Sequence, residues 1–151
     1  MKGQPEVLVE NLFFGDMGMF EFDPVLVHEW LRRSARRFPD KVALVCGEQR
    51  WSYKSLDCHT SHLALALVGL GVERQDRVVI LLDNSVETVI SLYGVLKAGC
   101  AFVVLPGSVK GPKLKYILDN SGASTLIAHT SKSKVVSDAL SRGQMDLRII
   151  W

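Results

Sequence analysis

The stretch "PGSVKGPK", residues 106–113, combines two glycines, two lysines and a serine in a short loop. Glycine-rich loops with a lysine cradle phosphates in nucleotide-binding proteins, but a Walker-type loop has four residues between its glycines, followed by Lys and Ser or Thr. Here three residues separate Gly107 from Gly111, and the next residue is Pro112, which has no N–H to offer a phosphate. We therefore predict a surface connector into a helix. Anion binding by the lysines around the start of that helix is the alternative.

A second group of reactive side chains consists of Cys58, His59 and His62, in which Cys58 and His62 have the i, i+4 spacing of one helix face. A closed zinc site needs four ligands, and the remaining histidines, His28 and His129, belong to other segments. Helix-packing and surface roles are therefore the simpler interpretation of this group. No Ser–His–Asp order or nucleophile elbow is present. We predict no catalytic, cofactor-binding or metal-binding residue in this chain.

Charged residues elsewhere have local explanations. Asp76 and Asp83 fit turns, and Glu87 fits the first turn of a helix, where the macrodipole favours a negative charge. Four arginines lie on the side of a predicted helix opposite its apolar stripe, namely Arg32, Arg33, Arg36 and Arg37. A solvated helix face explains them, and a basic partner-binding face is the alternative.

Bulk composition bounds the class of protein. The 151 residues are 48% hydrophobic and 23% charged with a net charge of +2, which is ordinary for one globular domain and lacks the basic bias of nucleic-acid-binding proteins. Apolar runs are too short for a membrane span, and the N-terminus lacks the pattern of a signal peptide. Three cysteines without framework spacing (Cys46, Cys58 and Cys100) indicate buried thiols in a cytoplasmic protein.

Strands and helices alternate along the chain. Strands are expected at 42–46, 50–53, 77–82, 101–105, 125–128 and 147–151. The first helix is expected to begin at Pro24 and to end at Pro39, with an apolar stripe of Val27, Leu31, Ser34 and Phe38, and the second to begin after Ser52 and to end at Gly69 and Gly71, with a stripe including Leu56, Leu63, Leu67 and Leu70. Three further helices are expected after Asn84-Ser85 (to Ala98), from Pro112 to Ser121 and from Ser131 to Arg142. The alternation predicts an α/β fold, a mainly parallel sheet with helices on both faces.

Three features refine this prediction. "RVVILL" (77–82) is a continuous apolar run, as in a strand covered on both faces. The helix after Ser85 is apolar nearly all round and should be largely buried. Asp23-Pro24 has the form of an N-cap followed by a first helical proline. Residues 1–23 are therefore expected to form an N-terminal arm, and residues 24–151 the α/β unit.

Longer stretches carry a family resemblance. "RWSYKSL" (50–56), the run from "LGVERQDRVV" to "AGCAFVVL" (70–105) and "LKYILDNSGASTLIA" (114–128) resemble the first part of the adenylate-forming, AMP-binding superfamily. "W-S-Y-x-x-L" is similar to the first core motif of the superfamily and "LKAGCAFVVL" to its second. "VHEWLRRSARRFPDKVALV" (27–45) is similar to the helix and strand that precede them. The resemblance runs in one order over residues 26–130.

Three positions depart from the family pattern. Ser55 stands where many members carry Glu in the first motif, which removes one arm of a capping box. Gln75 replaces the usual turn glycine before "DRV", and Pro106-Gly107 replaces the common Asn/Asp-Pro after the second motif. All three are structural positions. They do not bear directly on chemistry.

The resemblance implies that a carboxylate attacks the α-phosphate of Mg-ATP to give an acyl-adenylate, and that the thiol of CoA then displaces AMP. The phosphate loop, the adenine and ribose motifs, the hinge and the small domain with the catalytic lysine find no match in this chain, and neither does any catalytic position. We therefore expect the N-terminal subdomain of the large domain of an AMP-forming acyl-CoA ligase, inactive by itself. The variant "FVVL…K…KLKYIL" favours this class over peptide-synthetase domains.

Two alternatives stay open, a piece of a nonribosomal peptide-synthetase adenylation domain and a non-catalytic α/β interaction module. The expected partners are the remainder of a ligase chain and its carboxylic acid substrate, with ATP, Mg and CoA needed only by the intact enzyme. An unfinished sheet edge that includes Ile149, Ile150 and Trp151 predicts self-association.

Overall fold

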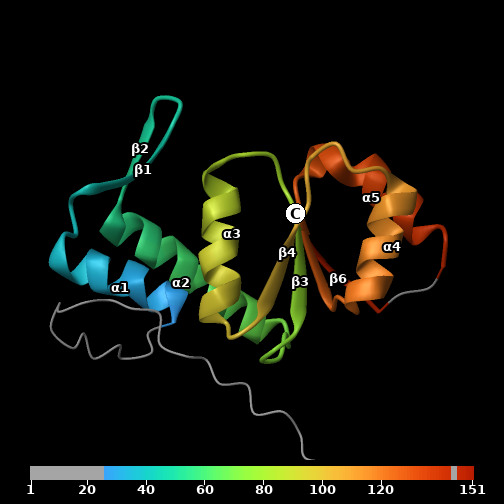
Figure 1. Cartoon of the computed structure of the whole chain (residues 1–151), viewed down its shortest axis with the longest axis horizontal. Helices are drawn as coiled ribbons and strands as arrows, with labels where there is room; N and C mark the ends of the chain where they lie inside the picture. Colours follow the sequence, from blue (N-terminus) through green and yellow to red (C-terminus); the bar gives the residue numbers. More distant parts are fainter. Residues whose placement is uncertain (1–25, 144–145) are drawn as a thin grey trace, which may run out of the picture.

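A parallel four-stranded sheet lies at the centre of the computed structural model, which describes residues 26–143 and 146–151 (Figure 1). Its strands are β3 (Arg77–Leu81), β4 (Ala101–Val104), β5 (Thr125–Ala128) and β6 (Arg148–Ile150), in the spatial order β4-β3-β5-β6. Every neighbouring pair is parallel. The prediction of an α/β fold with a mainly parallel sheet is confirmed. The predicted arm, residues 1–23, lies outside the described residues.

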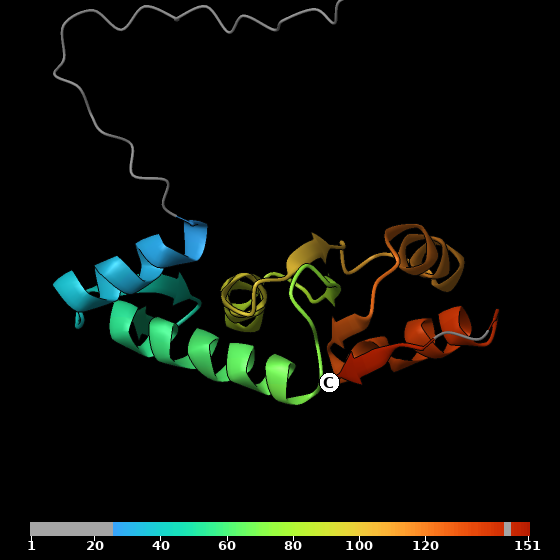
Figure 2. The ribbon, with the colours of Figure 1, turned by 90° about the horizontal axis from the view of Figure 1, so that it is seen from below.

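Helices cover both faces of this sheet. The helices α2 (Tyr53–Gly69) and α3 (Val86–Lys97) pack on one face, and α4 (Gly111–Ser121) and α5 (Ser133–Leu140) pack on the other (Figure 2). Side chains of β3 alternate between the two layers, since Val78 and Ile80 join the cluster under α2 and α3 while Val79 and Leu81 join the cluster under α4 and α5. All four are fully buried, as the apolar run predicted.

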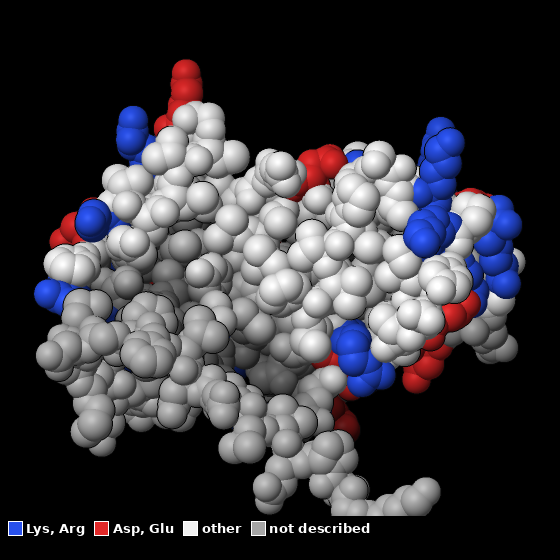
Figure 3. Space-filling view, in the orientation of Figure 1, with Lys and Arg blue, Asp and Glu red and all other residues white. Residues whose placement is uncertain are grey.

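A helix and a hairpin extend the α2 side of the molecule. The helix α1 (Val27–Arg37) packs against α2, and the antiparallel strands β1 (Val42–Cys46) and β2 (Gln49–Ser52) form a hairpin that projects from the body in Figure 1. In the same orientation, charged side chains gather toward the two ends of the molecule and few lie over α3 (Figure 3). Among the described residues, none of the helices combines the length and the apolar character that crossing a bilayer requires.

Helix ends follow the local sequence closely. The hydroxyl of Ser52 accepts a hydrogen bond from the N–H of Ser55 at 3.2 Å, which confirms the predicted cap of α2. Gly122 ends α4 in the left-handed conformation at φ +59°. The prediction for residues 131–142 is corrected in detail, because a 3-10 turn η1 (Thr130–Lys132) precedes α5 and the side chain of His129 caps that turn.

The start of α1 differs from the prediction. The expected N-cap, Asp23, lies outside the described residues, and the described helix begins at Val27 with Leu26 as its N-cap. Of the predicted apolar stripe, only Leu31 is buried, while Val27 and Phe38 are exposed. The prediction of a buried stripe is wrong for Val27 and Phe38, because α1 lies at one end of the molecule and has α2 as a neighbour on only part of its surface.

Two further expectations concern single residues. Gln75, at the position where the resemblance leads one to expect glycine, has φ +69° and is the one non-glycine residue with positive φ in the described ranges. Its N–H donates to the carbonyl of Gly99 at 2.8 Å, which holds it in that turn.

The expectation of buried thiols is correct for Cys100 but wrong for Cys58, which lies on the exposed surface of α2.

Candidate functional site

The order of the strands creates a crevice at the carboxyl edge of the sheet. β3 and β5 are neighbours, but the chain leaves β3 toward α3 on one face and leaves β5 toward α5 on the other. Open α/β sheets bind ligands at such a topological switch point. The structure has a crevice of about 350 Å³ there, lined by Leu82, Asp83, Ser85, Glu87, His129 and Ser131. We take these residues, which we call the switch-point crevice, as the candidate site.

Glu87 and His129 supply the titratable groups of this crevice. The pKa of Glu87 is lowered, first by a hydrogen bond from the Ser85 hydroxyl, then by the N–H of Glu87 itself and by the charge of His129, although desolvation acts in the opposite direction. Nδ1 of His129 lies 3.2 Å from the backbone nitrogen of Ser131 and 2.9 Å from its hydroxyl oxygen. The crevice thus offers a carboxylate and an imidazole to a ligand.

Lys132 joins three loops at the same edge of the sheet. Its Nζ lies 3.1 Å from Oδ1 of Asp83, which follows β3, and 3.0 Å from the carbonyl oxygen of Gly107, which follows β4. Lys132 itself lies in the turn that follows β5. A Cβ on Gly107 would overlap both the Asp83 carboxylate and the Lys132 ammonium. A carboxylate and a lysine from distant segments thus pack against the backbone of Gly107.

The sequence did not single out Lys132. Its partners Asp83 and Gly107 lie 49 and 25 residues away along the chain, so no local pattern connects them to Lys132. One signal was available, because the residues after parallel strands meet at one edge of the sheet. Asp83 was predicted to be a turn residue, and it also forms this ion pair.

Two lysines of the "PGSVKGPK" region and the helix it enters, Lys113 and Lys115, each contact a residue of their own helix. Nζ of Lys115 lies 2.6 Å from Asp119, and the ammonium of Lys113 lies 4.9 Å from the ring centroid of Tyr116. A Cβ on Gly111, at the start of α4, would overlap the carboxylate of Asp138 from α5. A negative charge of the chain itself thus lies beside the helix terminus that could attract an anion. That the loop holds no nucleotide stays a prediction.

Of the three reactive side chains on α2, Cys58, His59 and His62, only Cys58 and His62 contact each other through a sulfur and a ring nitrogen. Sγ of Cys58 and Nε2 of His62 lie 3.8 Å apart, while Nδ1 of His59 lies 2.8 Å from the carbonyl oxygen of Ser55 and its ring contacts Trp51 edge-on. In the part of the chain that the structure describes, no group of three or more His, Cys, Asp or Glu side chains is arranged to hold a metal ion. The absence of a metal site stays a prediction.

The crevice by itself is poorly suited to a triphosphate. It contains the carboxylates of Asp83 and Glu87, and the ammonium of Lys132, at the same edge of the sheet, already contacts Asp83 and Gly107. Carboxylates repel phosphate, and phosphoryl transfer requires positive charge or N–H donors around the anion. These residues can accept hydrogen bonds from a ligand.

Comparisons with known proteins agree on one family. The family model of the AMP-binding enzymes matches residues 31–150. Tyrocidine synthase 1 of Brevibacillus parabrevis is 33% identical over 79% of this chain, and surfactin synthase subunit 1 of Bacillus subtilis (strain 168) is 36% identical over 67%. The chain spans 11% and 3% of the lengths of these two relatives.

Solved structures show the same fold. VinN has a TM-score of 0.74 and 28% identity over 83% of this chain, which covers 33% of VinN. A benzoate CoA ligase from Burkholderia xenovorans LB400 has a TM-score of 0.75 and 24% identity over 81% of this chain, which covers 24% of the ligase. The family match spans the sheet, the helices on both of its faces and the switch-point crevice. The chain therefore belongs to the family of AMP-binding enzymes, within the adenylate-forming superfamily.

Proposed function

We propose that this chain is the N-terminal part of the large domain of a ligase that uses ATP, with Mg, to activate a carboxylic acid as its adenylate. The observation that carries the proposal is the family match over residues 31–150, which covers the whole sheet and the crevice at its carboxyl edge. In this proposal the chain builds a rigid wall beside the reacting groups, and the phosphate-binding donors come from other segments of the intact enzyme.

The relatives favour an amino acid as the carboxylic acid and a carrier-protein thiol as the acceptor. Two relatives are named as peptide synthetases, namely the probable nonribosomal peptide synthetase CymA of Salinispora arenicola at 32% identity and the phosphinothricin tripeptide synthetase PhsC of Streptomyces viridochromogenes at 33% identity. This reverses the preference for an acyl-CoA ligase that the variant "FVVL…K…KLKYIL" suggested. A CoA ligase is the second candidate, because the benzoate CoA ligase has the same fold over 81% of this chain.

In this proposal the chain positions the carboxyl ends of its strands beside the reacting groups. Lys132 connects the loops that follow β3, β4 and β5, so the three carboxyl ends of the strands are held as one surface. Catalytic groups carried by neighbouring segments need well-positioned supports, because small misplacements cost large factors in rate. Among the residues that the structure describes, no cation lines the crevice, so we expect no adenylation by residues 1–151 alone.

The proposal is tested with the complete gene product that carries this sequence. Carboxylate-dependent exchange of pyrophosphate into ATP is measured with a panel of amino acids, aryl acids and fatty acids. We expect exchange with one class, dependent on Mg. The activated acid is then offered to CoA and, separately, to a phosphopantetheinylated carrier protein. Absence of carboxylate-dependent exchange with every acid would refute adenylation, and thioester formation on CoA alone would select the second candidate.

A further inference from the structure

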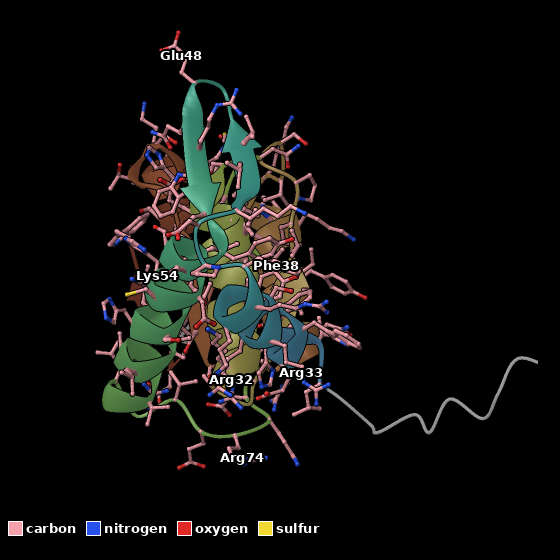
Figure 4. The ribbon with its side chains drawn as sticks, turned by 90° about the vertical axis from the view of Figure 1, so that its left-hand side faces the viewer. Arg32, Arg33, Phe38, Glu48, Lys54 and Arg74 are labelled. Atoms are coloured by element: carbon pink, nitrogen blue, oxygen red, sulfur yellow. The ribbon has the colours of Figure 1, made fainter. Side chains whose placement is uncertain are left out.

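The outer side of α1 carries an unusual combination of exposed rings and cations. Trp30 is 60% exposed and Phe38 is 45% exposed, and Leu26 and Val27 beside them are exposed as well. Arg33 and Phe38 lie along α1 on the surface that Figure 4 faces. We call this surface the α1 face, formed by Leu26, Val27, Trp30, Arg33, Arg37, Phe38 and Lys41. A cluster of exposed apolar side chains of this kind marks an interaction surface more often than isolated exposed residues do.

The cations of the α1 face contact its rings. The guanidinium of Arg33 lies 5.7 Å from the ring centroid of Trp30, while Arg37 and Lys41 lie 5.0 Å and 5.6 Å from that of Phe38. Over the described ranges, these three cations form no ion pair, in contrast to Arg32, which pairs with Glu29 at 2.7 Å. The α1 face therefore presents apolar rings and three cations that pair with no carboxylate of the described residues, and its complement is a segment that is both acidic and aromatic.

Such a segment immediately precedes α1 in the chain. Residues 6–23, "EVLVENLFFGDMGMFEFD", contain five acidic residues and no Lys or Arg, with four phenylalanines among their apolar residues. Charge complementarity and apolar complementarity thus coincide in one stretch. We infer that residues 6–23 bind the α1 face of their own chain, with their carboxylates near Arg33, Arg37 and Lys41 and their phenylalanines near Trp30 and Phe38.

The covalent connection allows this contact. An 11-residue helix such as α1 is about 16 Å long, and 18 residues span about 27 Å even if they are helical. Residues 6–23 can therefore reach every part of the α1 face after one reversal of direction. Because the segment ends at Asp23, three residues before Leu26, its effective concentration at the α1 face is in the millimolar range or above.

The test uses Trp30 as a reporter in the full chain. Trp51→Phe and Trp151→Phe leave Trp30 as the single tryptophan, and acrylamide quenching measures its exposure. We compare this parent with an arm variant (Glu10→Lys, Asp16→Lys, Glu21→Lys), a face variant (Arg33→Glu, Arg37→Glu, Lys41→Glu) and the combination of both. The matched control reverses three lysines away from α1 (Lys110→Glu, Lys113→Glu, Lys134→Glu).

We expect the quenching constant of Trp30 to rise about two- to threefold in the arm variant and in the face variant, and to fall again in the combination, because opposite charges are restored. The control variant should behave like the parent. Equal quenching in the parent and in both single-side variants would overturn the inference. So would protection of Trp30 that disappears on dilution, since that result would assign the α1 face to a second copy. Circular dichroism of each variant verifies that the helices are retained.

Discussion

Nζ of Lys97, near the end of α3, lies 2.6 Å from Oδ1 of Asp57 on α2. The same nitrogen is 2.9 Å from the carbonyl oxygen of Asp57 and 2.8 Å and 2.9 Å from the hydroxyls of Thr60 and Ser61. The side chain of Lys97 is only 10% exposed, so these oxygens replace the water that an ammonium group would otherwise bind. One lysine thus joins two helices across 40 residues of sequence.

Lys97→Met should therefore lower the free energy of unfolding by about 2–3 kcal/mol, because it leaves the partly buried Asp57 carboxylate without its counterion. Urea denaturation of the full chain measures this loss. Lys134→Met is the matched control, since Lys134 is exposed and has no ion pair within the described ranges, and it should change stability by less than about 0.5 kcal/mol. A Lys97→Met protein as stable as the control would contradict the role of the ion pair.

Gly94 allows α2 and α3 to approach closely. A Cβ at this position would lie 2.7 Å from Cδ2 and 2.9 Å from Cγ of Leu63. Gly94→Ala should lower the free energy of unfolding by about 1–3 kcal/mol, since the overlap outweighs the better helix propensity of alanine. Gly69→Ala, at the end of α2 and with open space around it, should be neutral or stabilising. A stabilising Gly94→Ala would show that the helices separate without cost.

Gln75 occupies a backbone conformation that favours glycine, with φ +69°. Gln75→Gly should raise the free energy of unfolding by about 0.5–1 kcal/mol, because relief of the strain exceeds the entropy that glycine adds to the unfolded chain. Thermal denaturation measures the gain. Glu48→Gly, at a position without positive φ, should give no gain. Equal effects of the two substitutions would remove backbone strain as the explanation.

Asp76 should make stability depend on pH in the acidic range. Its pKa is lowered, chiefly by the hydroxyl of Ser124 at 2.8 Å and then by the N–H of Glu73, while desolvation acts in the opposite direction. A carboxyl whose pKa is lower in the folded state stabilises the protein above its unfolded-state pKa, and this contribution is lost as pH falls through the folded-state pKa. Ser124→Ala should raise the pKa of Asp76 and flatten the acidic slope of stability.

The carboxyl carbon resonance of Asp76, followed by NMR during an acid titration, checks this shift directly. Ser141→Ala is the control, because the hydroxyl of Ser141 donates to the backbone carbonyl of Asp138 and is not among the groups that lower the pKa of Asp76. An unchanged Asp76 titration in Ser124→Ala would assign the lowered pKa to other groups.

The outer edges of the sheet should promote self-association. β4 has β3 as its only strand neighbour among the described residues, and Phe102 and Val104 on it are exposed. Within the part of the chain that the structure describes, β6 forms the opposite edge, next to the exposed Trp151. Exposed strand edges pair with other chains. We therefore expect a dimer by sedimentation at about 50 µM, weakened by Val104→Lys and Trp151→Lys. Tyr116→Lys, on α4, should leave the mass unchanged, and a monomeric parent would refute edge pairing.

Much of the fold was predictable because its signals are local. The apolar run 77–82, the cap at Ser52 and the end of a helix at Ser121 each follow from a few neighbouring residues, and the structure confirms all three. The position of the candidate site was less accessible. Asp83, Gly107 and Lys132 meet only because β4, β3 and β5 are adjacent in space, and the sequence contains no local mark of that adjacency.

The sequence by itself determined the α/β class, the parallel sheet and membership in the AMP-binding family, since periodicity, caps and ordered motifs are properties of consecutive residues. Only the tertiary structure decided that Lys132 joins three loops, that Lys97 connects α2 to α3, and that the rings of α1 face outward. The physical reason is that burial and ion pairing depend on which segments become neighbours. That choice is made by the packing of the whole chain, where distant residues compete for the same contacts.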